Sequence, residues 1–337
     1  MKPPIDLEPL FHGGDLATAR KLFPGAPEPF LDLSTGINPN PYLIAQLPPD
    51  AYTSLPQPAA LARLARIAAK AYGAPSAAHV AIAPGSQIVM TQLAGVIAKG
   101  RAVVLGPTYA EHARAAALAG HEVSETADVE QLGEAALAIV VNPNNPDGRL
   151  VGRDTLLSLA DRLQRRDGLL VVDEAFMEAA PEDAGLGDAV ASRGNIVVLR
   201  SFGKFYGLPG LRLSFALAAP EIAARLAAAL GPWPVSGAAL AIGAEALSDR
   251  DWKQAARASL ETAARRLDAL LAGAGLEVLG GTALFRLVRT PEAEHLFRQL
   301  GEAGVLVRRF ERQPGWLRFG LPGSEDEWQR LAAALPR

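Results

Sequence analysis

Residues 196–212 have the sequence Ile-Val-Val-Leu-Arg-Ser-Phe-Gly-Lys-Phe-Tyr-Gly-Leu-Pro-Gly-Leu-Arg. The apolar start is typical of a buried strand, and the glycines after it let backbone approach a ligand closely. Lys204 lies among aromatic and small residues, where desolvation makes its amine easier to deprotonate and nucleophilic towards carbonyls. Ser201 and Arg212 flank it with a hydroxyl and a fixed cation, a pairing suited to phosphate. A phosphorylated carbonyl compound held by a lysine indicates pyridoxal 5'-phosphate (PLP). A glycine-rich turn with a solvated lysine is the alternative.

Composition limits the class of protein. The chain has 337 residues, enough for one large α/β domain and a smaller one, and 49% of them are hydrophobic. A net charge of −3 without a basic stripe argues against nucleic-acid binding. The sequence has no cysteine, which excludes disulfides and thiolate chemistry, and its five histidines show no metal-ligand spacing. With no signal peptide or membrane span apparent, we expect a cytoplasmic protein without nucleic-acid or membrane partners.

Strands and helices alternate through the first two thirds of the chain. Apolar runs predict strands at 80–82, 102–105, 121–124, 138–141, 169–172 and 196–199. Helical spacing predicts helices at 58–72, 88–98, 110–119 and 153–166. Such alternation indicates an α/β fold with a mostly parallel central sheet and helices on both faces.

The break Gly231-Pro232-Trp233-Pro234 suggests a domain boundary. Helices predicted at 236–247, 252–271, 291–300 and 324–335, with short strands between them, form a smaller C-terminal α+β domain. The first 40 residues hold two glycine-centred polar turns and little apolar sequence, so we expect an arm that covers a ligand, with a mobile proline-rich tail as the alternative. The expected domains are therefore residues 1–40, 41–232 and 233–337.

Polar residues follow several of the predicted strands, where ligands bind in open α/β sheets. Asp173 ends an apolar run, and a buried carboxylate there needs a cation such as a protonated pyridine nitrogen, although a turn or capping aspartate also fits. Tyr109 is placed to stack on a ring and Asn145 to hydrogen-bond its hydroxyl. Ser86 and Gln87 begin a helix whose free N–H groups can cradle a phosphate, unless Ser86 is a simple N-cap.

The order of these motifs is more specific than any one of them. Residues 142–148 (Asn-Pro-Asn-Asn-Pro-Asp-Gly), 173–176 (Asp-Glu-Ala-Phe), 201–204 (Ser-Phe-Gly-Lys) and 210–213 (Gly-Leu-Arg-Leu) together resemble fold-type I PLP enzymes of the aspartate aminotransferase type. The resemblance extends over nearly the whole chain. It implies that Lys204 is the Schiff-base lysine and that Asp173 pairs with the pyridine nitrogen. The other cofactor contacts that it implies are Ser86, Gln87, Tyr109, Asn145, Ser201 and Arg212.

Four further segments narrow the resemblance to the histidinol-phosphate aminotransferase branch and, within it, to the threonine-phosphate decarboxylases of cobalamin biosynthesis. These segments are residues 12–15 (His-Gly-Gly-Asp), 31–39 (Leu-Asp-Leu-Ser-Thr-Gly-Ile-Asn-Pro), 173–177 (Asp-Glu-Ala-Phe-Met) and 318–322 (Arg-Phe-Gly-Leu-Pro). The resemblance implies that O-phospho-L-threonine contacts His12, Gly13, Gly36, Asn145, Arg308 and Arg318. Because Arg309 adjoins Arg308, the sequence leaves open which of the two faces the site.

The sequence departs from the family pattern at two places. Aminotransferases of this type often have tyrosine where this chain has Phe176, which removes one hydrogen bond to the ring oxygen. Relatives also carry a Tyr-Pro-Asp-Pro segment that reaches the phosphate of the neighbouring subunit. Here residues 55–58 are Leu-Pro-Gln-Pro, so that hydroxyl is missing unless Tyr52 replaces it. We still expect a homodimer.

The resemblance predicts PLP-dependent decarboxylation of O-phospho-L-threonine to 1-amino-2-propanol O-phosphate. The alternative is an aminotransferase acting on histidinol phosphate or a related phosphorylated amine. A non-enzymatic regulator with a PLP fold is disfavoured, because no DNA-binding segment is appended. Decarboxylation requires the bond from Cα to the carboxylate to stand perpendicular to the cofactor ring, whereas transamination requires the Cα–H bond to do so. That orientation is set by the folded site.

Overall fold

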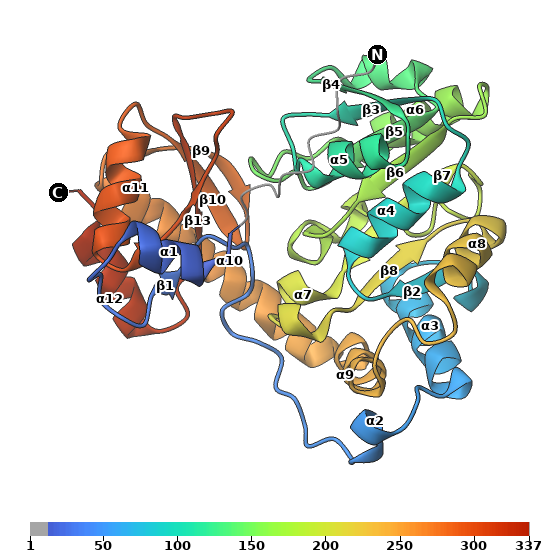
Figure 1. Cartoon of the computed structure of the whole chain (residues 1–337), viewed down its shortest axis with the longest axis horizontal. Helices are drawn as coiled ribbons and strands as arrows, with labels where there is room; N and C mark the ends of the chain where they lie inside the picture. Colours follow the sequence, from blue (N-terminus) through green and yellow to red (C-terminus); the bar gives the residue numbers. More distant parts are fainter. Residues whose placement is uncertain (1–12, 337) are drawn as a thin grey trace.

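The computed structural model describes residues 13–336, apart from the side chain of residue 182. These residues form two bodies, each built on its own sheet (Figure 1). The larger body contains seven strands in the order β2-β8-β7-β6-β5-β3-β4. Their bounds are Val80–Ala83 (β2), Arg101–Leu105 (β3), Glu122–Thr126 (β4), Leu137–Val141 (β5), Leu169–Asp173 (β6), Ile196–Ser201 (β7) and Ser214–Leu217 (β8).

The seven-stranded sheet is mostly parallel, as the sequence predicts. Strands β4, β3, β5, β6 and β7 pair in parallel, and only β8 runs antiparallel, between β7 and β2. The sequence analysis contains no strand at β8, because its four residues come directly after a turn and carry no flanking pattern. The parallel pairing places the carboxyl ends of β3, β5, β6 and β7 at one edge of the sheet.

Helices cover both faces of this sheet. One face carries α4 (Ser86–Val96), α5 (Glu111–Leu118) and α8 (Pro220–Leu230), and the other carries α3 (Pro58–Tyr72), α6 (Arg153–Gln164) and α9 (Gly237–Ser248). Successive strand residues alternate between the two layers, so that Val171 packs in one apolar cluster and Val172 in the other. Burial on both faces explains why the strands are apolar at nearly every position.

The smaller body is built on an antiparallel sheet in the order β12-β13-β10-β9. Its strands are Glu277–Thr282 (β9), Phe285–Arg289 (β10), Arg308–Arg309 (β12) and Trp316–Gly320 (β13). Its helices are Arg250–Gly273 (α10), Ala293–Glu302 (α11) and Glu325–Ala334 (α12). The long helix α10 runs from the larger body into the smaller one (Figure 1).

The N-terminal segment packs on this smaller body. Strand β1 (Leu31–Asp32) pairs in parallel with β11 (Val305–Leu306), and the segment also contains α1 (Leu16–Leu22). Phe23 is buried and meets Phe297 edge-on, with 5.5 Å between ring centroids. Residues 16–34 therefore contribute to the core of the smaller body, although their sequence shows little apolar patterning. The chain then crosses to the larger body through α2 (Asp50–Thr53).

The described part also contains the one-turn helix α7 (Phe202–Phe205) and short 3₁₀ helices at Ala77–His79, Val129–Glu134, Met177–Ala179, Glu182–Ala184 and Pro209–Leu211. Within residues 13–336, no helix combines the length and apolarity needed to cross a membrane.

Candidate active site

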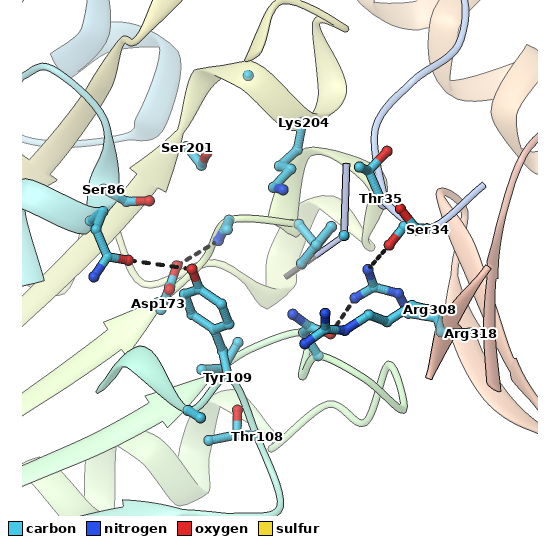
Figure 2. A pocket seen from close by; sticks show the side chains of 18 of the residues that line it. Ser34, Thr35, Ser86, Thr108, Tyr109, Asp173, Ser201, Lys204, Arg308 and Arg318 are labelled. Carbon is cyan, nitrogen blue, oxygen red and sulfur yellow. Dashed lines mark hydrogen bonds between the residues drawn. The ribbon is translucent and has the colours of Figure 1, made fainter. Parts of the chain in front are cut away.

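A cavity of about 370 Å³ opens between the two bodies at the carboxyl edge of the large sheet. Four predicted strand ends meet in its wall: Tyr109 after β3, Asn145 after β5, Asp173 at the end of β6, and Lys204 after β7 (Figure 2). A volume of this size is typical of a small-molecule site. The sequence separates these residues by up to 95 positions, and the parallel sheet brings them together.

Lys204 points into the middle of the cavity from α7 (Figure 2). Phe202 and Phe205, both fully buried, anchor this single helical turn in the core. The lysine Nζ lies 5.8 Å from the centroid of the Phe176 ring. The pKa of Lys204 is lowered to about 8, mainly by burial and also by Arg318 and Arg212, while Asp173 opposes the shift. A much larger fraction of this amine is therefore uncharged near neutral pH than for an ordinary lysine.

Asp173 is held by neighbours on both carboxylate oxygens. Its Oδ2 lies 2.8 Å from His112 Nε2, and its Oδ1 accepts a hydrogen bond of 3.0 Å from the Ala175 N–H. Asp173 and His112 are both buried. The sequence analysis missed His112, although its position three residues after Tyr109 places both on one side of a helix start. The His112 and Tyr109 rings indeed meet edge-on, with 6.1 Å between centroids.

Tyr109 is held in place by two consecutive side-chain hydrogen bonds. Its hydroxyl donates to Gln87 Oε1 at 3.3 Å, and Gln87 Nε2 donates to Glu111 Oε2 at 2.9 Å. Burial raises the pKa of Tyr109 to about 12, with Glu111 and Asp173 adding to the rise. Tyr109 therefore stays neutral at physiological pH and offers the cavity a fixed aromatic face. Glu111, which holds Gln87, was also missed by the sequence analysis.

The predicted phosphate residues lie at one end of the cavity. Ser86 begins α4, Ser201 ends β7, and both face the cavity beside Arg212. Gly85, with φ +100, has no room for a side chain, since an added Cβ would collide with the Arg212 guanidinium. The Arg212 Nη1 donates to the Pro209 carbonyl at 3.2 Å. Two hydroxyls, a guanidinium and the N-terminus of an 11-residue helix suit a phosphate group.

Arg318 lies at the other end of the cavity, on β13. Its Nη1 donates to Asn145 Oδ1, its Nη2 donates to the Ser34 carbonyl at 2.9 Å, and its guanidinium lies 4.9 Å from the Phe285 ring centroid. The pKa of Arg318 is lowered to about 9, mainly by burial and also by Arg308, while Asp32 opposes the shift. This buried cation is thus suited to bind an anion.

Arg308 and Arg309 are neighbours on β12 and extend in different directions. Arg308 lies beside Arg318 at the cavity (Figure 2), and burial lowers its pKa. Arg309 reaches Glu294 at 3.3 Å and lies 5.0 Å from the Phe297 ring centroid, although it also contributes to the wall. Of the two, Arg308 is the better candidate for an anion ligand.

The predicted glycines have different positions. Gly13 lines the cavity against the Ser34 carbonyl, with no space for a Cβ. Gly36 lies behind the wall, where an added Cβ would be 2.9 Å from Phe285 and 3.1 Å from Phe176. The glycine therefore lets these two rings pack beside the cavity. His12 falls outside the described residues.

The residues present fit PLP. Lys204 supplies an amine of lowered pKa for the carbonyl, and the buried Asp173 carboxylate suits a protonated ring nitrogen. Ser86, Ser201 and Arg212 suit the phosphate. The fold and this set of groups define a PLP-dependent enzyme of fold type I.

Comparison with known proteins agrees with this class. Residues 50–335 match the family model for aminotransferase class I and II. A threonine-phosphate decarboxylase from Sinorhizobium sp. is 44% identical over 98% of both chains, and one from Pseudomonas aeruginosa is 42% identical over 97% of both. The crystal structure of histidinol-phosphate aminotransferase from Sinorhizobium meliloti in complex with pyridoxal-5'-phosphate superimposes with a TM-score of 0.83 at 21% identity, covering 100% of this chain and 96% of that one. The chain belongs to the aminotransferase class I and II family.

Proposed function

We propose that this chain decarboxylates O-phospho-L-threonine to 1-amino-2-propanol O-phosphate, a reaction of cobalamin biosynthesis. One observation carries the proposal. A single cavity holds Lys204 and Asp173 together with two guanidinium groups, Arg308 and Arg318, at one of its ends. A substrate with both a carboxylate and a phosphate matches two cations. The names of the two relatives above 40% identity support the same reaction.

When bound, PLP supplies an electron sink for the bond that breaks at the substrate α-carbon. Lys204 holds the cofactor, Asp173 stabilises the protonated ring nitrogen, and Tyr109 covers the ring. Ser86, Gln87, Ser201 and Arg212 surround the phosphate. His112 orients the Asp173 carboxylate, because its Nε2 lies within hydrogen-bond distance of the carboxylate Oδ2.

Arg318 and Arg308 orient the substrate. The contacts of Arg318 with Asn145 and Ser34 fix its guanidinium in the wall, and Arg308 stands beside it from β12. We assign the substrate carboxylate to Arg318 and the substrate phosphate to Arg308 and His12. Lys204 Nζ, with its pKa near 8, is suited to deliver a proton to the α-carbon once CO₂ has left.

Incubation with O-phospho-L-threonine tests the proposal. We expect release of CO₂ and formation of the phosphorylated amine without any keto acid. Turnover that depends on a keto acid, with histidinol phosphate as a good amino donor, would instead establish an aminotransferase. Absence of turnover with every phosphorylated amine tested would contradict both activities.

We further propose that the chain acts as a homodimer in the cytoplasm. Large apolar side chains are exposed along the segment that joins the two bodies, with 84% of Leu43, 70% of Tyr52 and 60% of Leu55 accessible. Trp233 is also 56% exposed. Burying such residues against a second copy would remove an apolar surface from water. Light scattering should give twice the chain mass, and Leu43→Glu should shift the protein towards monomer.

A further inference from the structure

Arg318 has unusual surroundings for an arginine. It is only 7% exposed, and the hydrogen-bond acceptors of its guanidinium are the amide oxygen of Asn145 and the backbone carbonyl of Ser34, both uncharged. Among residues 13–336, three other charged groups act on it or respond to it: Arg308 from β12, Lys204 from α7 and Asp32 from β1. Two of these are cations, and Asp32 is the carboxylate that favours the charged form of Arg318.

Ser34 connects Asp32 to Arg318. The Ser34 hydroxyl donates to Asp32 Oδ1 at 2.5 Å, and the Ser34 N–H donates to the same oxygen at 2.9 Å. The carbonyl of the same residue accepts from Arg318 Nη2 at 2.9 Å. Ser34 is buried, with 1% exposed. The Asp32 carboxylate therefore fixes both the side chain and the backbone of the residue on which Arg318 rests.

The same serine holds the glycine turn that lines the cavity. The Gly14 N–H donates to Ser34 Oγ at 2.8 Å, and Gly13 packs directly on the Ser34 carbonyl. The base of this arrangement is rigid, because Asp32 pairs with Leu306 and the Gly320 N–H donates to the Leu33 carbonyl at 2.7 Å. Asp32 and Ser34 thus join β1, β13 and the Gly13–Gly14 turn at one point.

We propose that Asp32 is a positioning residue for substrate recognition, acting through Ser34. Its carboxylate holds the Ser34 carbonyl and hydroxyl so that Arg318 and the Gly13–Gly14 turn are in place before an anionic substrate binds. Its negative charge also offsets the repulsion that Arg308 exerts on the buried Arg318 guanidinium. This inference rests on the proposed function for the identity of the substrate. The positioning of Arg318 by Ser34 and Asp32 does not depend on that identity.

The first test does not use catalysis. Phenylglyoxal reacts with uncharged guanidines, and peptide mass spectrometry reports the labelling rate of Arg318 alone. In the holoenzyme, Asp32→Asn loosens the hold on Ser34, the residue that accepts from Arg318, so the Arg318 guanidinium should become more accessible and its labelling rate at pH 8 should rise roughly fivefold to tenfold. Ser34→Ala keeps the carbonyl but breaks the link to Asp32, so it should raise the rate by a smaller factor. Asp15→Asn is the matched control, because Asp15 caps α1 through Thr18 and should leave the Arg318 rate unchanged.

The second test separates positioning from support of the fold. With O-phospho-L-threonine, we expect Asp32→Asn to raise KM about tenfold while kcat changes less than about twofold.

The outcomes can be told apart. Unchanged Arg318 labelling and unchanged KM in both variants would overturn the role of Asp32. Equal losses of kcat/KM in Asp32→Asn, Ser34→Ala and Asp15→Asn, together with a lower melting temperature, would show that the N-terminal segment only supports the fold. If the wild-type enzyme does not turn over O-phospho-L-threonine, the proposed function fails, and the labelling experiment still decides the inference about Asp32.

Discussion

The two ends of the cavity are built in different ways. At the cofactor end, Lys204 and Asp173 sit at or just beyond adjacent parallel strands, and Asp173 already has a hydrogen-bond partner in His112. At the substrate end, Arg318 meets the carbonyl of Ser34, which is 284 positions away in the sequence, and two arginines of lowered pKa stand together. The first end is set by one sheet, whereas the second requires β1, β12 and β13 to assemble.

This difference has a functional meaning. Groups on a shared sheet edge can serve any substrate of the cofactor, because they depend only on the fold. Arg308 and Arg318 repel each other, and an anionic substrate at this end of the cavity would offset that repulsion. We therefore expect changes at the cofactor end to affect every substrate, and changes at Arg308 to affect phosphorylated substrates selectively.

The largest effect should come from Lys204→Ala. Loss of an amine that holds the cofactor and carries a proton should lower kcat by about 10⁴-fold or more with every substrate. Borohydride reduction of the wild-type holoenzyme followed by peptide mapping should place the pyridoxyl group on Lys204. Lys70→Ala, on an exposed position of α3, is the control. A label on any other lysine would contradict the assignment.

Asp173→Asn should have the next largest effect. Loss of the charge that stabilises the protonated ring nitrogen should raise the barrier by ~3–4 kcal/mol, since preorganised electrostatic groups contribute about this much. We expect a fall in kcat of about two to three orders of magnitude, with the fold and much of the cofactor retained. Steady-state kinetics and the cofactor absorbance check this. The control is Asp161→Asn, which breaks a surface ion pair with Arg193 and should have the wild-type kcat. A near-normal kcat in Asp173→Asn would contradict the proposed role of Asp173.

Arg308→Ala tests the substrate end. Removing one charged contact should cost ~2–3 kcal/mol, or about 30- to 100-fold in kcat/KM, with O-phospho-L-threonine. The loss should largely vanish with unphosphorylated threonine, already a poor substrate. His12→Ala should show the same selectivity. Arg309→Ala is the matched neighbour and should have a much smaller effect, because Arg309 is engaged by Glu294 and Phe297. Equal losses with both substrates would mean that Arg308 supports the fold instead.

The smallest effect concerns stability of the protein without PLP. The folded-state pKa of Lys204 is about 8, below its ordinary value. Between these two values the unfolded chain binds more protons, so the contribution of Lys204 to stability rises with pH. Its destabilising effect is complete below pH 8 and fades towards pH 10. Lys204→Met should therefore raise the melting temperature by roughly 2–4 °C at pH 7 and by less at pH 10. An equal gain at both pH values would refute the lowered pKa.

Much of the cofactor end could be predicted from local sequence. Residues 169–172 and 196–199 are apolar because both faces of their strands are covered, and the polar residues that follow must lie at the carboxyl edge. The predicted PLP chemistry and family are confirmed by the family match and the relatives. The individual roles of the site residues remain predictions.

Other features have no local signature. The sequence analysis did not predict β8, because a four-residue strand directly after a turn does not reveal its direction. It also missed the contact between His112 and Asp173, since a hydrogen bond across 61 positions follows no period.

The sequence by itself therefore determined the alternating α/β architecture and the position of Lys204 and Asp173 at the ends of buried strands. Buried strands leave apolar runs that can be recognised locally, and the polar residues that follow them mark the strand ends. The tertiary structure decided which of Arg308 and Arg309 lies beside Arg318, and it placed Ser34 under that arginine. It did so through the pairing of β1 with β11 and of β12 with β13. Such long-range pairings depend on the shape and charge of both partners at once, and neither partner carries that information in its own stretch of sequence.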